Sequence, residues 1–129
     1  MKKGGESVKE WFSFAKEDFK LASLGLETGI IPELLCFHAQ QSVEKAIKAL
    51  LLQYDQDFPK THNIQILLSQ LSFFIEIPDQ VMRAETLTDY AVTTRYPGIY
   101  EKISEDEYKN AIKLSLEVIN WAEALIIDA

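Results

Sequence analysis

The sequence FHAQQSVEKAIKALL, residues 37–51, decides the fold because it carries large apolar residues on both sides of a helix. On a helical wheel one broad arc holds Leu35, Cys36, Ala39, Val43, Ala46, Ile47, Ala49 and Leu50, and the other holds Phe37, Gln40, Gln41, Glu44, Lys45, Lys48 and Leu51. A helix with this pattern is predicted to be covered on most of its circumference. We therefore expect a central helix surrounded by others.

The polar residues of this helix allow two interpretations. Gln40, Gln41, Glu44 and Lys48, here called the polar seam, could line a semi-buried groove between helices. Alternatively, Glu44 and Lys48 form a solvated pair, because they are four residues apart in the favourable order, and such a pair contributes a few tenths of a kcal/mol.

The remaining sequence is divided by caps and turn residues into further amphipathic helices. Including the central helix, the expected ranges are 7–28, 32–54, 61–74, 78–94 and 104–126. Ser7 with Glu10 and Ser104 with Glu107 have the spacing of capping boxes. The sequence therefore predicts an all-α fold, an antiparallel up-and-down bundle of four to five helices. Residues 7–129 form its single domain, after a flexible N-terminus at 1–6.

Composition and charge limit the function classes. The chain has 129 residues, 47% of them hydrophobic, and a formal net charge of -7. This charge repels polyanions at long range, so any phosphate contact requires a local group of cations. Cys36 is the single cysteine and lies in an apolar run, which is typical of a buried thiol in a reducing cytoplasm. We expect no membrane segment, because no apolar run has the required length.

The sequence TRYPGIYE, residues 94–101, contains a second candidate site. Arg95 offers a planar set of donors suited to phosphate, Tyr96 can stack or hydrogen-bond, and Gly98 permits close approach of the backbone. The alternative interpretation is structural: Arg95 satisfies the last carbonyls of a helix, and the residues after it form a turn.

Three motifs in this order, FHAQQSVEKAIKALL, FPKTHNIQILLSQL and YAVTTRYP, resemble the HEPN domain of prokaryotes. The N-terminal WFSFAKEDFKLA and the C-terminal helix also fit, so the resemblance covers essentially the whole chain. It implies a bundle of four or five helices that forms a homodimer and is often encoded beside a minimal nucleotidyltransferase. Some HEPN families are toxin-like ribonucleases, whereas others bind nucleotides or act as accessory or scaffold modules.

The resemblance also assigns roles to residues. In ribonuclease members an arginine is followed roughly four to six positions later by a histidine, whereas residues 96–102 contain none. This absence counts against catalysis. It leaves a site for nucleotide or phosphate, to which the resemblance assigns Arg95, Tyr96, Gln41, Glu44, Lys45 and Lys48.

The two histidines are expected to have structural duties. His62 follows Thr61 in the loop before the third helix, where Thr61 or Asn63 can cap that helix and the His62 ring can bond to the central helix. A catalytic role for His62 through the fold stays open. His38 is expected to be partly buried and satisfied. We predict no metal site, because two lone histidines without a spaced carboxylate pair do not make one.

Three functions remain from the sequence. The preferred one is a homodimeric accessory module that binds a nucleotide or phosphate, without a cofactor, and pairs with a nucleotidyltransferase in a toxin-antitoxin system. The second is a metal-independent endoribonuclease toxin with a divergent site around Arg95. The third is a helical dimerisation scaffold without a ligand.

Overall fold

The structure, a computed structural model, describes residues 5–93 and 102–127. Its α-helices and 3₁₀ helices (η) are α1 (Gly5–Ala22), η1 (Leu26–Thr28), α2 (Pro32–Gln53), α3 (Ile64–Leu71), α4 (Asp79–Met82), η2 (Arg83–Asp89), α5 (Tyr90–Thr93) and α6 (Glu105–Leu125). Every element in this described part of the chain is helical, which confirms the predicted all-α bundle.

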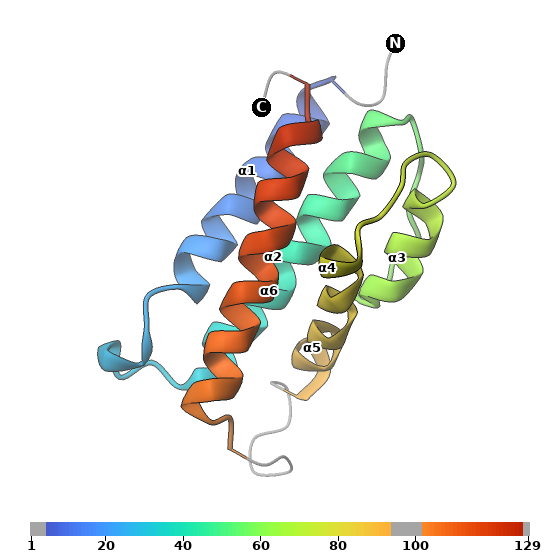
Figure 1. Cartoon of the computed structure of the whole chain (residues 1–129). Coiled ribbons are helices and arrows are strands. Elements are labelled where there is room, and N and C mark those ends of the chain that lie inside the picture. Colours follow the sequence, from blue (N-terminus) through green and yellow to red (C-terminus); the bar gives the residue numbers. More distant parts are fainter. Residues whose placement is uncertain (1–4, 94–101, 128–129) are drawn as a thin grey trace.

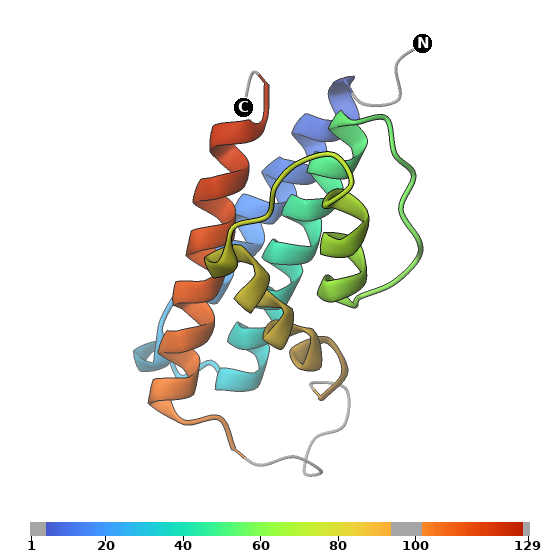
Figure 2. The same cartoon turned by 45° about the vertical axis from the view of Figure 1, so that its right-hand side comes forward.

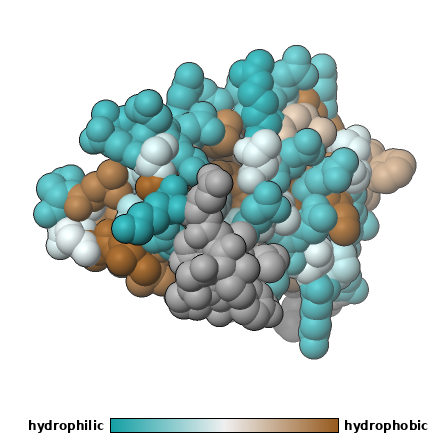
Figure 3. Space-filling view, turned by 90° about the horizontal axis from the view of Figure 1, so that it is seen from below, coloured by the Kyte–Doolittle hydropathy of each residue, from teal (hydrophilic) through white to brown (hydrophobic). Residues whose placement is uncertain are grey.

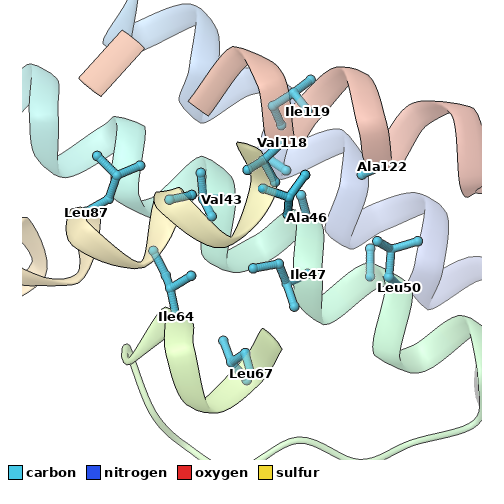
Figure 4. Packing of buried hydrophobic residues seen from close by; sticks show 14 of the residues in the cluster. Val43, Ala46, Ile47, Leu50, Ile64, Leu67, Leu87, Val118, Ile119 and Ala122 are labelled. Carbon is cyan, nitrogen blue, oxygen red and sulfur yellow. The ribbon is translucent and has the colours of Figure 1, made fainter. Parts of the chain in front are cut away.

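The central position predicted for α2 is confirmed. Helices α1 and α6 pack along one side of α2, and α3 with the series α4–η2–α5 covers the other (Figures 1 and 2). Of the 22 residues of α2, 15 are buried. Figure 4 shows Val43 and Ile47 facing the neighbouring helices, with Ile64 and Leu67 of α3 nearby and Leu87 of η2 to the left. The helix is therefore held by apolar contacts around its circumference.

Two of the predicted helix caps are confirmed. The Ser104 hydroxyl accepts a hydrogen bond from the backbone N–H of Glu107 at 3.1 Å. The Asn63 side chain likewise accepts one from the backbone N–H of Ile66 at 3.1 Å. The Glu107 carboxylate accepts a hydrogen bond from the Tyr90 hydroxyl at 2.6 Å, and this bond joins α5 to α6.

The first helix differs from its predicted range at both ends. Helix α1 begins at Gly5, so Ser7 lies inside the helix and is not its N-cap. The capping-box spacing is a local signal, and glycine is also acceptable where a helix starts, which is consistent with the earlier beginning. The helix ends at Ala22 because Gly25 has a φ of 95°, which no right-handed helix accommodates.

The predicted fourth helix is divided into α4, η2 and α5. The buried residues of η2 are Ala84 and Leu87, three positions apart, and they continue the spacing from Val81 at the end of α4. A 3₁₀ helix has three residues per turn and therefore places Ala84 and Leu87 on one face. Packing against the core selects the tighter helix.

The connection between α2 and α3, residues 54–63, determines where the polar loop residues lie. It runs back along α2, so α3 points in the same direction as α2 (Figures 1 and 2). Tyr54 at the end of α2 consequently stacks on Phe74 just after α3, with the ring centroids 5.6 Å apart. This path brings His62 beside the middle of α2.

Exposed apolar residues gather at the end of the bundle where α2 begins. The view from below shows hydrophobic surface over the connection between α1 and α2 (Figure 3). The exposed residues of this region are Leu21, Leu24, Ile30, Ile31 and Leu34. We call them the apolar end. Among the residues described, none of the helices combines the length and apolarity that a membrane span requires.

The core position of Ile47 yields a stability prediction. Its side chain is fully buried, so Ile47→Ala leaves a cavity and is expected to lower the free energy of unfolding by about 3 kcal/mol. Urea denaturation followed by circular dichroism measures the change. Phe73→Ala is the control: Phe73 is 86% exposed, and its removal should change stability by less than about 0.5 kcal/mol. Equal effects of the two substitutions would contradict the central role of α2.

Candidate ligand-binding site

The polar seam is a buried hydrogen-bond network centred on Glu44, which is only 3% exposed. The Glu44 carboxylate accepts from Lys48 Nζ at 2.7 Å and from Gln40 Nε2 at 3.0 Å. Gln41 Nε2 lies 3.5 Å from the same carboxylate and donates to Gln40 Oε1 at 2.7 Å. The interpretation of Glu44 and Lys48 as a solvated pair is therefore wrong, because both side chains are buried.

His62 joins this network from the α2–α3 connection. Its Nδ1 lies 2.9 Å from Glu44 Oε1, and its backbone carbonyl accepts from Gln40 Nε2 at 3.0 Å. The predicted tie between the loop and the central helix is thus confirmed. Since an ionised carboxylate can only accept, we assign the proton of this contact to Nδ1.

The pKa of the Glu44 carboxyl results from two opposing influences. Burial alone would raise it, because a low-dielectric environment disfavours the charged form. Hydrogen bonds from Lys48, His62 and Gln40 outweigh burial and hold the pKa below its usual value. Glu44 is therefore an anion at neutral pH and a permanent acceptor for its partners.

Two aromatic rings also contact the Lys48 ammonium group. Lys48 Nζ lies 5.5 Å from the ring centroid of Trp11 on α1 and 5.0 Å from that of Phe58 in the connection. The two rings meet edge to face, 5.3 Å apart. Cation–π contacts thus add to the ion pair and link α1 and the connection to α2.

A second network lies between α1 and α2. Asp18 is buried on α1, and its carboxylate contacts His38 Nδ1 at 3.0 Å and Lys45 Nζ at 2.6 Å. His38 is partly buried and satisfied, as expected. Sequence reasoning missed Asp18, although Ala15 and Ala22 on either side belong to the apolar stripe and marked its position as inward-facing.

The structure brings Gln41, Glu44, Lys48 and His62 together, whereas Lys45 belongs to the network around Asp18. Thr61 supports the loop, since its hydroxyl accepts from the backbone N–H of Asn63 at 3.0 Å. Arg95 and Tyr96 lie outside the described residues.

The described residues flanking Arg95 and Tyr96 contact α6 and α2. The Tyr90 hydroxyl donates to Glu107 in the first turn of α6. On the other side, the Ile103 backbone N–H lies 3.4 Å from a carboxylate oxygen of Glu33 in the first turn of α2. The chain therefore leaves and re-enters the described fold at the end of the bundle where both helices begin.

In the described part of the chain, the Cys36 thiol is unreactive and no group of side chains is arranged as a metal site. Burial, followed by the nearby charges of Glu107 and Glu33, raises the pKa of the Cys36 thiol to about 12. The thiol is therefore protonated and unreactive at neutral pH. Within residues 5–93 and 102–127, no group of three His, Cys, Asp or Glu side chains is arranged to hold a metal ion.

The Glu44 network yields a pH-dependent prediction. Glu44→Gln leaves Lys48 buried without its counter-charge and should cost about 3 kcal/mol at pH 7. The folded pKa of Glu44 lies below its unfolded value of about 4.3, so its stabilisation is present above that pH and is lost as the pH falls through the folded pKa. The difference between wild type and variant should accordingly shrink in acid.

Urea denaturation at neutral and acidic pH tests this expectation. Glu17→Gln is the matched control, because Glu17 pairs with Lys20 on the surface, where both side chains are exposed. Its effect should stay below about 0.5 kcal/mol. A loss in Glu44→Gln no larger than this control would refute the proposed role of Glu44.

Solved structures share this architecture. The crystal structure of TT1696 from Thermus thermophilus matches with a TM-score of 0.81 and 26% identity, covering 92% of this chain and 98% of that one. ST0689, described as an archaeal HEPN homologue, matches with a TM-score of 0.71 and 27% identity over 93% of this chain and 98% of its own. A HEPN domain protein of Thermotoga maritima shares the fold, with a TM-score of 0.69, 24% identity and coverage of 94% and 97%.

Among curated proteins, the putative toxin MJ1304 of Methanocaldococcus jannaschii is 30% identical over 101 residues. The match covers 72% of this chain and spans 65% of the length of that relative. The sequence profile of the HEPN domain matches residues 8–125, nearly the whole chain. Together with the helical bundle and its structural neighbours, this match shows that the chain belongs to the HEPN domain family.

Proposed function

We propose that the chain is the HEPN component of a toxin-antitoxin pair, in which it binds a phosphate-bearing ligand such as a nucleotide. The similarity to a protein named a putative toxin supports the pair. Because the match spans 65% of that protein, the proposal concerns the shared region. A small nucleotidyltransferase is the proposed partner, and the reducing cytoplasm is the proposed location, consistent with the buried thiol of Cys36.

The observation that carries the binding function is the network around Glu44. It holds the half-exposed side chain of His62 in a defined orientation at the surface of α2. Preorganisation of this kind lowers the entropic cost of binding a ligand. Lys45 and Lys48 each pair with a carboxylate, so in this proposal Lys48 stabilises the network and Lys45 the contact between α1 and α2, while Arg95 supplies the phosphate donors.

The second candidate function is a metal-independent ribonuclease toxin. One observation favours it: although no histidine follows Arg95 at the usual spacing, His62 is oriented through Nδ1 by a carboxylate. The same pattern orients general bases in enzymes, because it leaves Nε2 to exchange a proton with the substrate. In this alternative Arg95 stabilises the charge that develops on the phosphate.

A comparison of the chain's two arginines tests both functions. Arg95→Ala is expected to weaken binding of a nucleotide, measured by isothermal titration calorimetry, about tenfold or more, because one charged hydrogen-bonded group is lost. Arg83→Ala is the control, since Arg83 is an exposed arginine on η2. Neither the wild type nor either variant should cleave labelled RNA in the presence of a chelator.

Three other outcomes would change the conclusion. Cleavage by wild type but not by Arg95→Ala would replace the binding function with the ribonuclease. Equal binding by wild type and both variants would remove Arg95 from the site. The absence of any phosphate binding, in a protein that still forms dimers, would favour the ligand-free scaffold.

We also propose that the chain forms a homodimer through the apolar end, because contiguous exposed apolar surface of this kind marks an interaction site. Light scattering should give the mass of two chains. Ile31→Asp places a charge in this surface, since Ile31 is 52% exposed, and should shift the protein towards the monomer. Ile127→Asp, at an isoleucine 72% exposed beyond α6, should remain dimeric. A monomeric wild type would contradict the proposal.

A further inference from the structure

The side chain of His62 is exposed, yet hydrogen bonds hold the residue in one orientation. Its side chain is 51% exposed, and a side chain this accessible ordinarily samples several rotamers. Here Gln40 holds the backbone carbonyl of His62, and Glu44 holds the ring. A structural tie needs only one of these bonds. The double attachment fixes the direction of the imidazole and of its second nitrogen.

The contact with Glu44 determines the chemistry of that second nitrogen. Since Nδ1 donates to an ionised carboxylate, Nε2 of the neutral ring has only a lone pair to offer. On protonation, Nε2 becomes an N–H donor while the bond from Nδ1 is kept. Protonation therefore turns Nε2 from a hydrogen-bond acceptor into a donor and gives the ring a positive charge. The contact with Glu44 keeps the ring in the same position.

The charges around His62 favour an anionic ligand on the protonated ring. The charged groups at the ring are Glu44 and its partner Lys48, both of α2, whose opposite charges balance. Trp11 of α1 and Phe58 of the connection complete the cluster, and neither titrates in this range. Lys60, exposed and two residues before His62, is the charged residue of the connection nearest to it in sequence, while the exposed Asp55 and Asp57 lie further back.

We propose that His62 is a proton-linked phosphate contact: the imidazolium Nε2–H donates to an oxygen of a phosphodiester, so binding of the ligand takes up one proton. The ligand class is a phosphodiester, which either a cyclic nucleotide or RNA can supply. The inference rests on the phosphate-binding function proposed above and adds to it a second residue and a dependence on pH.

The substitution His62→Asn separates this role from a structural one. The asparagine amide can still donate to Glu44 from near the position of Nδ1, but it has no counterpart of Nε2. His38→Asn is the matched control, because His38 makes the same kind of contact with Asp18. Circular dichroism and urea denaturation establish that each variant is folded.

Binding of a cyclic mononucleotide and of a single-stranded oligoribonucleotide is measured from about pH 5.5 to about pH 8.5, the range in which histidine titrates. Internal phosphodiesters keep a constant charge over this range, so any pH dependence comes from the protein. For wild type, the dissociation constant should increase with pH, by a factor that approaches tenfold for each pH unit at the alkaline end. His62→Asn should bind about tenfold more weakly at acidic pH and show a flat profile, whereas His38→Asn should behave like wild type.

At the alkaline end of this range, calorimetry in buffers of different ionisation enthalpy should show uptake of about one proton by wild type and none by His62→Asn. Binding of either probe with this profile supports the inference, and the probe that binds identifies the source of the phosphodiester. Unchanged affinity and pH dependence in His62→Asn would overturn it. If Arg95→Ala then weakens binding, the proposed function survives without His62. If wild type binds neither probe at any pH, the inference fails, and the nucleotide titration with Arg95→Ala decides the proposed function separately.

Discussion

A buried carboxylate in the middle of the central helix constrains much of this structure. Glu44 is itself buried on a helix that its neighbours cover over most of its circumference, and an unpaired charge there would cost several kcal/mol. Its own helix supplies Gln40 and Lys48, and the connection to α3 supplies His62. Because that third donor comes from a loop, the loop must return along α2. The direction of α3 follows from this path.

The same arrangement occurs twice on α2. Glu44 with Lys48 and His62 forms one network, and Asp18 with Lys45 and His38 forms the other. In each, a carboxylate and a lysine balance their charges, and a histidine contacts the carboxylate through Nδ1. Protonation of the histidine would add one positive charge to either network. The His62 side chain is 51% exposed and that of His38 is 32% exposed, so His62 is better placed to meet a ligand.

Much of the fold could be predicted because helical patterns are local. The apolar arcs predicted burial around α2, and the Asn63 and Ser104 caps placed the starts of α3 and α6. The division of the fourth helix could have been read from the spacing of Val81, Ala84 and Leu87, which matches three residues per turn. The start of α1 could not, because Ser7 and Gly5 are both acceptable in a first turn and the capping-box pattern favoured the later residue.

The sequence by itself determined the helical class, the central place of residues 37–51 and the burial of most of that helix, since these follow from the periodicity of apolar residues along a short stretch. It also suggested that His62 contacts the central helix. Only the tertiary structure decided that Glu44 receives this contact, that Lys45 pairs with Asp18, and that Lys48 contacts the rings of Trp11 and Phe58. These partners are far apart along the chain. Their choice depends on how the helices pack and where the loop returns, and neither leaves a periodic signal in the sequence.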